Sequence, residues 1–284
     1  MKKNIIFLFL ICLGLVFSLL SLMIPKKEKV ITTMQTYSLS RSEEDLVLPY
    51  KIEQEMIETF LSEPKSQVID PGVYPENGVS WLIGLTDEGS PKMQYETHET
   101  IYNAQGEAVS RFLIPYSTWI KEESPKTYSY GAPVEIGSYF VSARATSYGV
   151  DCVGCGGEDG FGGTAVGIQM SLTSVRQSDG TWKEGITYDG YYLIATDKNI
   201  PFCTIVEISK HRWNGKGLVA GESFQALVVD RGGAIKNSNI DLFTGSEANS
   251  GVTNGTRRGV HVEIIGFGKR TRNSLGERIC QVTK

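Results

Sequence analysis

The chain has 284 residues, and its 28 Lys and Arg against 32 Asp and Glu give a formal net charge of −4 at pH 7. This mild acidity excludes nucleic acid as the main partner, because phosphate binding needs a basic face. Hydrophobic residues make up 40% of the chain and aromatic residues 10%, which suffices for a packed core and excludes disorder throughout. The 31 glycines favour a β-rich fold with many turns.

The first segment of the chain differs in kind from the rest. The stretch Ile5–Ile24 has no charged side chain and, as a helix, is long enough to cross a hydrocarbon core of about 30 Å. Cleavage of a signal peptide requires two small residues two positions apart, which Ser18 and Ser21 do not provide. We therefore predict that residues 1–30 are an uncleaved membrane anchor, with a cleaved signal segment and a secreted body as the alternative.

The remainder of the chain is predicted to face the cell wall. Residues 31–45 are polar and are expected to form a tether. Residues 1–30 carry five Lys and one Glu, so the rest has a net charge of −8, which suits a soluble exported body. The predicted location is the cell membrane, with an extracellular body.

Four cysteines lie outside the apolar segment: Cys152, Cys155, Cys203 and Cys280. An even number in an exported chain favours two disulfides, for which three pairings exist. Free thiols and a zinc site with four thiolates are the alternatives, and a single Cys-x-x-Cys pair is a weak zinc signal. We predict no metal and no cofactor.

The first folded unit is predicted to cover residues 46–132. In Tyr50–Ser62, apolar residues recur at helical spacing, which predicts a short helix. Lys92–Tyr102 then alternates polar and apolar residues, and the turn Asn103–Gly106 separates it from a second predicted strand, Ala108–Ile114.

Three glycines and a strand pattern carry a resemblance in this unit. Gly89, Gly106 and Gly131 lie in the stretch Gly84–Gly131, around an alternating strand and a Pro-containing end. This arrangement resembles the G-five surface domain. The resemblance implies a wall-facing module that binds amino sugars, and a plain β spacer is the alternative role.

The second unit is predicted to cover residues 133–284 and to consist of short strands with frequent turns. A glycine-dense loop, residues 149–167, follows the first strand. This pattern predicts a small closed β-barrel or sandwich rather than a βαβ sheet. The predicted strands are Tyr139–Tyr148, Tyr191–Thr196, Thr204–Ile208, Phe224–Asp230 and Val260–Phe267.

Three aspartates follow apolar runs in this unit: Asp197 after YYLIAT, Asp230 after FQALVV and Asp241 after NSNI. Burial and neighbouring carboxylates raise the pKa of a carboxyl group, because both disfavour its charged form. Such a group stays protonated near neutral pH and can act as a general acid. The alternative is that each aspartate caps a turn through hydrogen bonds to the backbone.

Five motifs carry a second resemblance: ATSYG, GGTAVG, LIATDKNIP, VVDRGGAIKN and IDLF occur in this order. They resemble the three-aspartate (3D) domain of exported bacterial wall proteins, which is shared with the membrane-bound lytic transglycosylase A family and the stationary-phase survival proteins. The resemblance implies a double-psi β-barrel whose three aspartates converge in one groove. The predicted fold class is thus mainly β, with this barrel, a smaller β-rich module and an N-terminal transmembrane helix.

The resemblance also implies roles for individual residues. Asp241 matches the catalytic acid and base, and Asp230 and Asp197 match two supporting aspartates. The substrate-binding positions that it implies are Thr146, Tyr148, Thr164, Gly232, Gly233 and Lys236.

The chain departs from the family pattern at two positions near the aspartates. Arg231 stands where the family has Thr, and Asn237 stands where it has Gly. A guanidinium that pairs with a carboxylate lowers its pKa and would weaken a general acid, unless it points outward. The insertion Ser178–Gly190 is expected to extend the groove wall through Trp182.

The implied substrate is the glycan strand of peptidoglycan. Asp241 would protonate the glycosidic oxygen between N-acetylmuramic acid and N-acetylglucosamine, and the muramic 6-hydroxyl would close a 1,6-anhydro ring. This lytic transglycosylase chemistry needs one acid and base, whereas ordinary glycosidases use two carboxylates. A non-catalytic carbohydrate-binding wall protein is the alternative. The predicted partners are the glycan and, through residues 5–24, the membrane; the sequence does not identify a protein partner.

Overall fold

The computed structural model describes residues 51–154, 157–253 and 257–282. This part of the chain consists of strands and turns and contains no helix, so the prediction of a mainly β fold is confirmed. The predicted anchor Ile5–Ile24 and tether 31–45 lie outside the described residues. Among the residues that are described, none forms a helix long and apolar enough to cross a membrane.

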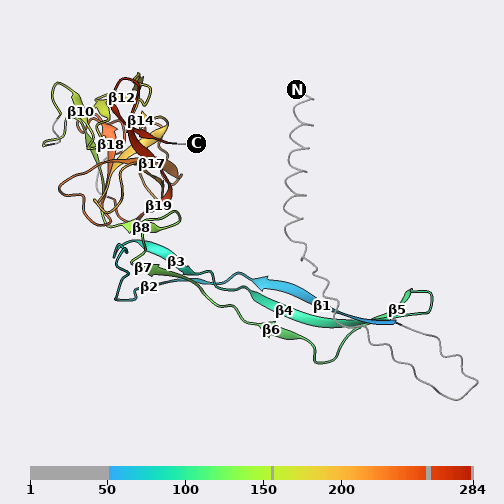
Figure 1. Cartoon of the computed structure of the whole chain (residues 1–284). Helices are drawn as coiled ribbons and strands as arrows, with labels where there is room; N and C mark the ends of the chain where they lie inside the picture. Colours follow the sequence, from blue (N-terminus) through green and yellow to red (C-terminus); the bar gives the residue numbers. More distant parts are fainter. Residues whose placement is uncertain (1–50, 155–156, 254–256, 283–284) are drawn as a thin grey trace, which may run out of the picture. The chain divides into compact units, whose positions relative to one another are not determined.

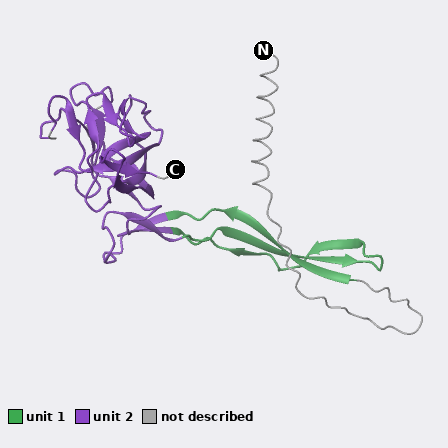
Figure 2. Ribbon diagram, turned by 45° about the horizontal axis from the view of Figure 1, so that its top comes forward, with its two compact units in different colours: residues 1–66, 88–126 green, residues 67–87, 127–284 purple. Residues whose placement is uncertain are grey.

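Contacts divide the described chain into two units, and each is described by itself (Figure 2). Unit 1 comprises residues 51–66 and 88–126, and unit 2 comprises residues 67–87 and 127–282. The chain therefore passes between the units more than once. The predicted division at residue 132 differs from these units, because strand pairing joins segments that are far apart in the sequence.

Unit 1 is a four-stranded antiparallel sheet. Its central strand, β4 (Lys92–Tyr102), pairs with β1 (Lys51–Ser62), β5 (Ala108–Leu113) and β6 (Trp119–Lys121). The side-chain oxygen of Asn103 accepts two backbone N–H groups of the turn between β4 and β5. The predicted hairpin of β4 and β5 is confirmed.

The helix predicted over Tyr50–Ser62 is wrong, because this segment is strand β1. Its residues pair with β4 from Lys51 opposite Tyr102 to Phe60 opposite Met93. The hydrogen bonds of this long pairing, together with Ile and Thr side chains that favour strands, override the local helical spacing. A partner strand so far along the chain is invisible to a local pattern.

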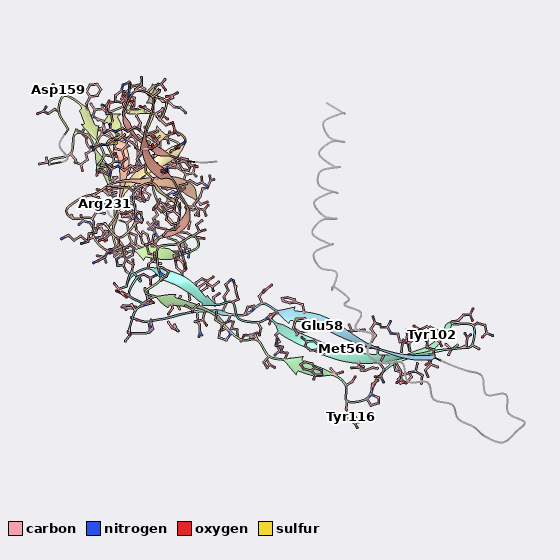
Figure 3. All side chains as sticks on the ribbon, viewed as in Figure 1. Met56, Glu58, Tyr102, Tyr116, Asp159 and Arg231 are labelled. Carbon is pink, nitrogen blue, oxygen red and sulfur yellow. A yellow bond between two sulfur atoms is a disulfide. The ribbon has the colours of Figure 1, made fainter. Side chains whose placement is uncertain are left out.

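The side chains of unit 1 lie along a single layer of strands, as Figure 3 shows for Met56, Glu58 and Tyr102. No described residue of this unit is buried, and every residue of β5 is exposed. Backbone hydrogen bonds and cross-strand contacts therefore hold the sheet in place of a core. One such contact is the stacked pair of Tyr95 and Trp119, whose ring centroids lie 4.0 Å apart.

Unit 2 contains an 11-stranded sheet (Figure 1). Its strands are β2 (Ser66–Ile69), β3 (Ile83–Asp87), β7 (Lys126–Tyr130), β8 (Tyr139–Ser142), β9 (Ala145–Gly149), β14 (Thr187–Tyr188), β15 (Tyr191–Ala195), β16 (Thr204–Ser209), β17 (Phe224–Asp230), β18 (Ile240–Gly245) and β19 (Val260–Phe267). They run in the order β2, β7, β3, β8, β19, β16, β17, β15, β18 and β9, with β14 paired to β15.

Two small sheets complete unit 2. One contains β10 (Phe161–Gly163), β11 (Gln169–Ser171), β12 (Ser174–Arg176) and β13 (Trp182–Glu184), and the other pairs β20 (Lys269–Arg272) with β21 (Arg278–Gln281). The predicted insertion Ser178–Gly190 thus supplies β13 and β14.

The core of unit 2 is formed by apolar side chains of its central strands. Val228 of β17, Leu242 of β18 and Val262 of β19 are fully buried. Two strand pairs of the large sheet are parallel, β15 with β17 and β18 with β9, while β15 and β18 are antiparallel. Closure into a double-psi β-barrel stays a prediction.

Most of the strands predicted for unit 2 agree with the structure to within a residue. The exception is Tyr139–Tyr148, which is divided into β8 and β9 at Ala143 and Arg144. The division arises because the two halves have different partners: β8 pairs with β19, and β9 pairs with β18.

The described cysteines form disulfides. Cys203, just before β16, is bonded to Cys280 in β21, with Cα atoms 5.4 Å apart. Cys152 is also disulfide-bonded. A zinc site with four thiolates is therefore wrong, because these sulfur atoms are already in covalent bonds.

Candidate active site

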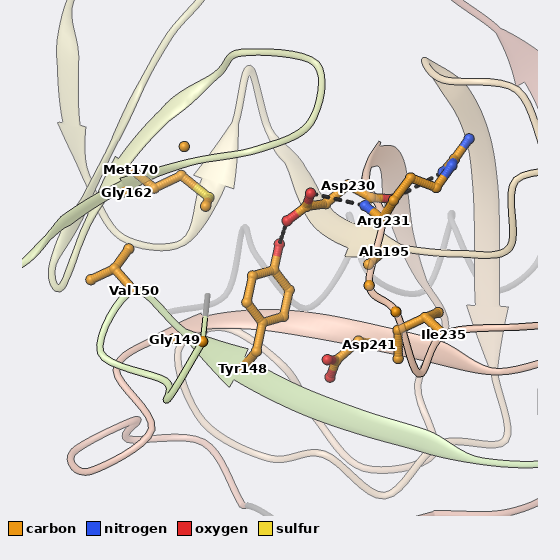
Figure 4. Close-up of a pocket in the computed structure, with 14 residues that line it drawn as sticks. Tyr148, Gly149, Val150, Gly162, Met170, Ala195, Asp230, Arg231, Ile235 and Asp241 are labelled. Carbon is orange, nitrogen blue, oxygen red and sulfur yellow. Dashed lines mark hydrogen bonds between the residues drawn. The ribbon is translucent and has the colours of Figure 1, made fainter. Parts of the chain in front are cut away.

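A cavity of about 220 Å³ is lined by residues from six strands of unit 2 (Figure 4). Its lining includes Tyr148 of β9, Gly162 of β10, Asp230 of β17 and Asp241 of β18. The sheet register explains this convergence, because Ala195 of β15 pairs with Asp230 on one side and with Asp241 on the other. Two of the three predicted aspartates therefore face one cavity.

Asp241 is half-buried, and its carboxyl group has a raised pKa. Thr146 lies opposite it in the parallel pair of β18 and β9, and its Oγ1 donates to Asp241 Oδ1 at 2.7 Å. Burial raises the pKa of Asp241 to about 6, and the nearby charges of Glu247 and Asp230 act in the same direction. The hydrogen bond from Thr146 and the charge of Arg144 partly offset this rise in pKa.

Asp230 lies in the same cavity but is bound on both carboxylate oxygens. The hydroxyl of Tyr148 donates to Oδ2 at 3.1 Å, and the backbone N–H groups of Ala165 and Arg231 donate to Oδ1 at 2.9 and 2.8 Å. Burial and the charge of Asp230 raise the pKa of Tyr148 well above its ordinary value, so this phenol keeps its proton and donates it. Three hydrogen-bond donors thus fix the position of the Asp230 carboxylate.

Asp197 is buried and is not among the residues that line the cavity. Its Oδ1 accepts the N–H of Asn199, and its Oδ2 accepts the N–H of Asn237, both at 2.8 Å. The expectation that all three aspartates meet in one groove is therefore met by Asp230 and Asp241 alone. Asp197 ties the loop after β15 to the loop after β17 instead, because backbone amides occupy both of its oxygens.

The guanidinium of Arg231 is directed away from Asp241, as Figure 4 shows. It donates to the carbonyls of Asp230 and Ile200 and to the hydroxyl of Thr196, and it lies 3.9 Å from the ring centroid of Phe202. The substitution of Thr by Arg therefore places no cation on the acid. It anchors the loop after β17 to the loop after β15.

The second departure, Asn237, also has a local reason. Its φ is +55°, a left-handed conformation that Asn tolerates better than most residues other than Gly. Gly232 and Gly233, in the same loop, line the cavity as expected. Lys236 is exposed and does not line it.

Thr164 does not line the cavity but stabilises a turn next to it. Its buried Oγ1 accepts the N–H of Ile168 at 3.1 Å and closes a turn. The next residue in this turn, Ala165, donates its N–H to Asp230. Sequence reasoning missed Ala165 because a backbone donor leaves no trace in residue type; only the GGTAVG motif marked the turn.

Three apolar residues around the cavity were not foreseen either. Val150, Met170 and Ile235 line it, because β9, β11 and the loop after β17 meet there. Trp182 of the insertion does not line it, but its ring packs edge-on against Phe161 with centroids 5.9 Å apart. Phe161 directly precedes the lining residue Gly162. Within the described ranges, no group of three or more His, Cys, Asp or Glu side chains is placed to hold a metal ion.

Comparison with known families places the aspartates in a known type of domain. Residues 192–266 match the 3D domain family. Asp197, Asp230 and Asp241 all lie inside this 3D domain match. The predicted substrate-binding positions in β9 and in the glycine-dense loop precede it.

Individual relatives cover smaller parts of the chain. The SPbeta prophage-derived uncharacterized protein YorM of Bacillus subtilis (strain 168) is 34% identical over 105 residues, which are 36% of this chain and 33% of that protein. The chain thus spans about one third of the length of this curated relative. A solved G5 domain of IgA1 protease is 21% identical and covers 30% of this chain and 90% of its own, with a TM-score of 0.20. This neighbour is of the domain type predicted for residues 46–132, and at this TM-score it supports no statement about the fold.

Proposed function

We propose that this protein is a lytic transglycosylase that cleaves the bond between N-acetylmuramic acid and N-acetylglucosamine in peptidoglycan, with Asp241 as its acid and base. The observation that carries the proposal is the half-buried Asp241 carboxyl, which lines the cavity with a pKa raised to about 6. A carboxyl with this pKa is partly protonated at slightly acidic pH and also serves as a base after giving up its proton. The 3D domain match supports a cell-wall substrate.

The surroundings of Asp230 favour a mechanism with one acid over hydrolysis. Glycoside hydrolases use two carboxylates, of which the second activates water or forms a covalent intermediate. The Asp230 carboxylate is the other acidic group of the cavity, and three donors already occupy its oxygens. Three of its about four acceptor sites are thus occupied, which leaves little room for an attacking water, so we assign it the roles of orienting Tyr148 and raising the pKa of Asp241.

The chemistry then proceeds in two proton transfers at Asp241. The carboxyl donates its proton to the glycosidic oxygen as the bond to the muramic C1 breaks, and positive charge develops on that sugar ring. The muramic 6-hydroxyl attacks C1, and its proton passes to the Asp241 carboxylate. The product is a 1,6-anhydro sugar, no water is consumed, and the attacking group is already held in place.

Two exposed aromatic side chains beside the cavity extend the proposed glycan site. Phe161 and Trp182 are 58% and 40% exposed and contact each other edge to face. The apolar faces of such aromatic rings can pack against the apolar faces of sugar rings. We place the body on the wall side of the membrane, held by the anchor predicted from Ile5–Ile24.

The test is digestion of purified peptidoglycan sacculi, followed by mass analysis of the released fragments. Wild-type protein should release 1,6-anhydro fragments, whereas Asp241→Asn, which keeps the shape but cannot donate a proton, should lose at least about 100-fold in rate. Asp189→Asn is the matched control, because Asp189 lies in an exposed turn with φ +49° that Asn also tolerates. Unchanged cleavage by Asp241→Asn would refute the assignment, and reducing-end products would show hydrolysis instead.

A non-catalytic glycan-binding role is the second candidate, and the exposed pair of Phe161 and Trp182 favours it. In that case wild-type protein and Asp241→Asn would sediment equally with sacculi, and neither would release fragments. If the protein only binds glycan, Trp182→Ala should weaken its sedimentation with sacculi. If the protein is an enzyme, Trp182→Ala should lower the rate of fragment release.

A further inference from the structure

A second cavity, of about 490 Å³, lies apart from the candidate active site and is lined by Lys210, Arg212, Arg257 and Arg258. All four lining residues are cationic at neutral pH, although the chain as a whole carries a net charge of −4. Such a concentration of one charge in a hollow of an acidic protein focuses the field on anions.

Strand pairing brings the two basic segments together. Lys210 follows the end of β16, and Arg258 lies just before β19. These strands are antiparallel, and their last pair is Ser209 opposite His261, so the chain leaves β16 at the place where it enters β19. Lys210 turns away from the strand with φ +56°. The cluster is therefore a product of the sheet register, not of a basic run in the sequence.

Three of the four cations of the cluster lie outside the ion pairs of the described residues. In the described part of the chain, Lys210, Arg212 and Arg258 form no ion pair with Asp or Glu. The acidic pair of Glu207 and Glu263 lies further along β16 and β19, beyond the pair that contains His261. Cations this close repel one another, and a bound anion removes that repulsion.

We propose that this basic cavity binds a phosphate group. Arginine presents a planar fork of N–H donors that pairs with two oxygens of a phosphate at once, and lysine adds a point charge. A phosphate carries more negative charge and more acceptor oxygens than a carboxylate, which has one charge and two oxygens, so it can pair with more cations at once. Three arginines and a lysine around one hollow therefore favour phosphate over carboxylate.

The phosphate site adjoins the strand that positions the proposed acid, and it does not depend on catalysis. Arg257 and Ala145 exchange two backbone hydrogen bonds, of 2.7 and 2.8 Å, and Thr146 next to Ala145 donates to Asp241. A phosphate ester carried by a wall polymer could thus be held beside the glycan. Free inorganic phosphate has the same chemistry, and the experiment distinguishes these two sources.

The test is calorimetric titration of the full chain, purified in mild detergent, with inorganic phosphate, glycerol 3-phosphate or acetate. Arg212→Ala combined with Arg258→Ala should weaken phosphate binding at least tenfold. The matched control combines Lys183→Ala with Lys269→Ala, which removes two exposed positive charges of unit 2 that do not line the cavity. Thermal unfolding without phosphate checks that both double variants are folded.

The outcomes separate the alternatives. Tighter binding of glycerol 3-phosphate than of inorganic phosphate indicates a phosphate ester as the ligand, and the reverse order indicates free phosphate. Acetate binding as tight as phosphate binding, equal loss in the control variant, or no binding of any phosphate overturns the proposal. This experiment does not measure glycan cleavage. A negative result would therefore not affect the transglycosylase proposal, and loss of the transglycosylase proposal would not affect the phosphate site.

Discussion

Two carboxyl groups on either side of Ala195 have different surroundings and therefore different chemistry. Asp230 accepts three hydrogen bonds, whereas Asp241 accepts one, from Thr146. Burial dominates at Asp241 and raises its pKa to about 6. The sequence places both residues after apolar runs, but only the structure shows that burial dominates at Asp241 while three donors surround Asp230.

The activity of a protein that uses Asp241 as its acid should fall as the pH rises through about 6, because the proton to be donated is then lost. Thr146→Val removes a hydrogen bond that lowers the pKa of Asp241. The pKa of Asp241 should therefore rise, and the falling limb of the pH–rate profile should move to higher pH.

This shift is measured from rates of fragment release from sacculi between pH 4 and pH 8, at substrate saturation. Thr271→Val, in β20, is the control and should leave the profile in place. If the falling limb of the pH–rate profile stays in place or moves to lower pH in Thr146→Val, Asp241 is not the acid that titrates.

At the scale of elements, Asp197 connects two loops rather than reacting. It ties Asn199, after β15, to Asn237, after β17, and Arg231 reinforces the same connection through the carbonyl of Ile200. The loop that it holds carries Gly232 and Gly233 into the cavity wall.

Asp197→Ala should destabilise the protein by about 1–3 kcal/mol, because the partly exposed backbone N–H groups of Asn199 and Asn237 lose their carboxylate acceptor. Asp197→Asn keeps one acceptor oxygen and should lose about half of that free energy. Urea unfolding of unit 2 checks both values. Equal unfolding free energies for wild type and Asp197→Ala would mean that the connection contributes nothing.

The elements themselves were predictable where their signal is local. The hairpin of β4 and β5 and the strands β15, β16, β17 and β19 follow from alternation, β-branched residues and turns. β1 was missed because its identity depends on pairing with β4, and the small sheet of β10 to β13 was missed because glycine-rich and polar segments carry weak strand signals.

At the scale of the whole molecule, the two units are held by different forces. No described residue of unit 1 is buried, whereas unit 2 has a core of fully buried Val, Leu and Ile side chains and the disulfide between Cys203 and Cys280. A sheet without a core opens locally at low free energy, since few apolar contacts are lost when its hydrogen bonds break.

Amide hydrogen exchange followed by mass spectrometry should therefore show protection in β1 and β4 at least about tenfold lower than in β17 and β19. Reduction of the disulfides is the control for unit 2: it should lower protection there and leave β1 and β4 unchanged. Equal protection of both units in the oxidised protein would contradict a coreless unit 1.

The β class, most strands of unit 2 and the motifs that contain the aspartates follow from the amino-acid sequence alone, because these depend on residue type and near neighbours. Three properties emerge only in the folded chain: β1 is a strand, Asp230 and Asp241 share a cavity while Asp197 does not, and four cations meet beside β16 and β19. These properties arise from strand register between distant segments and from backbone donors. Neither of these leaves a mark on local composition.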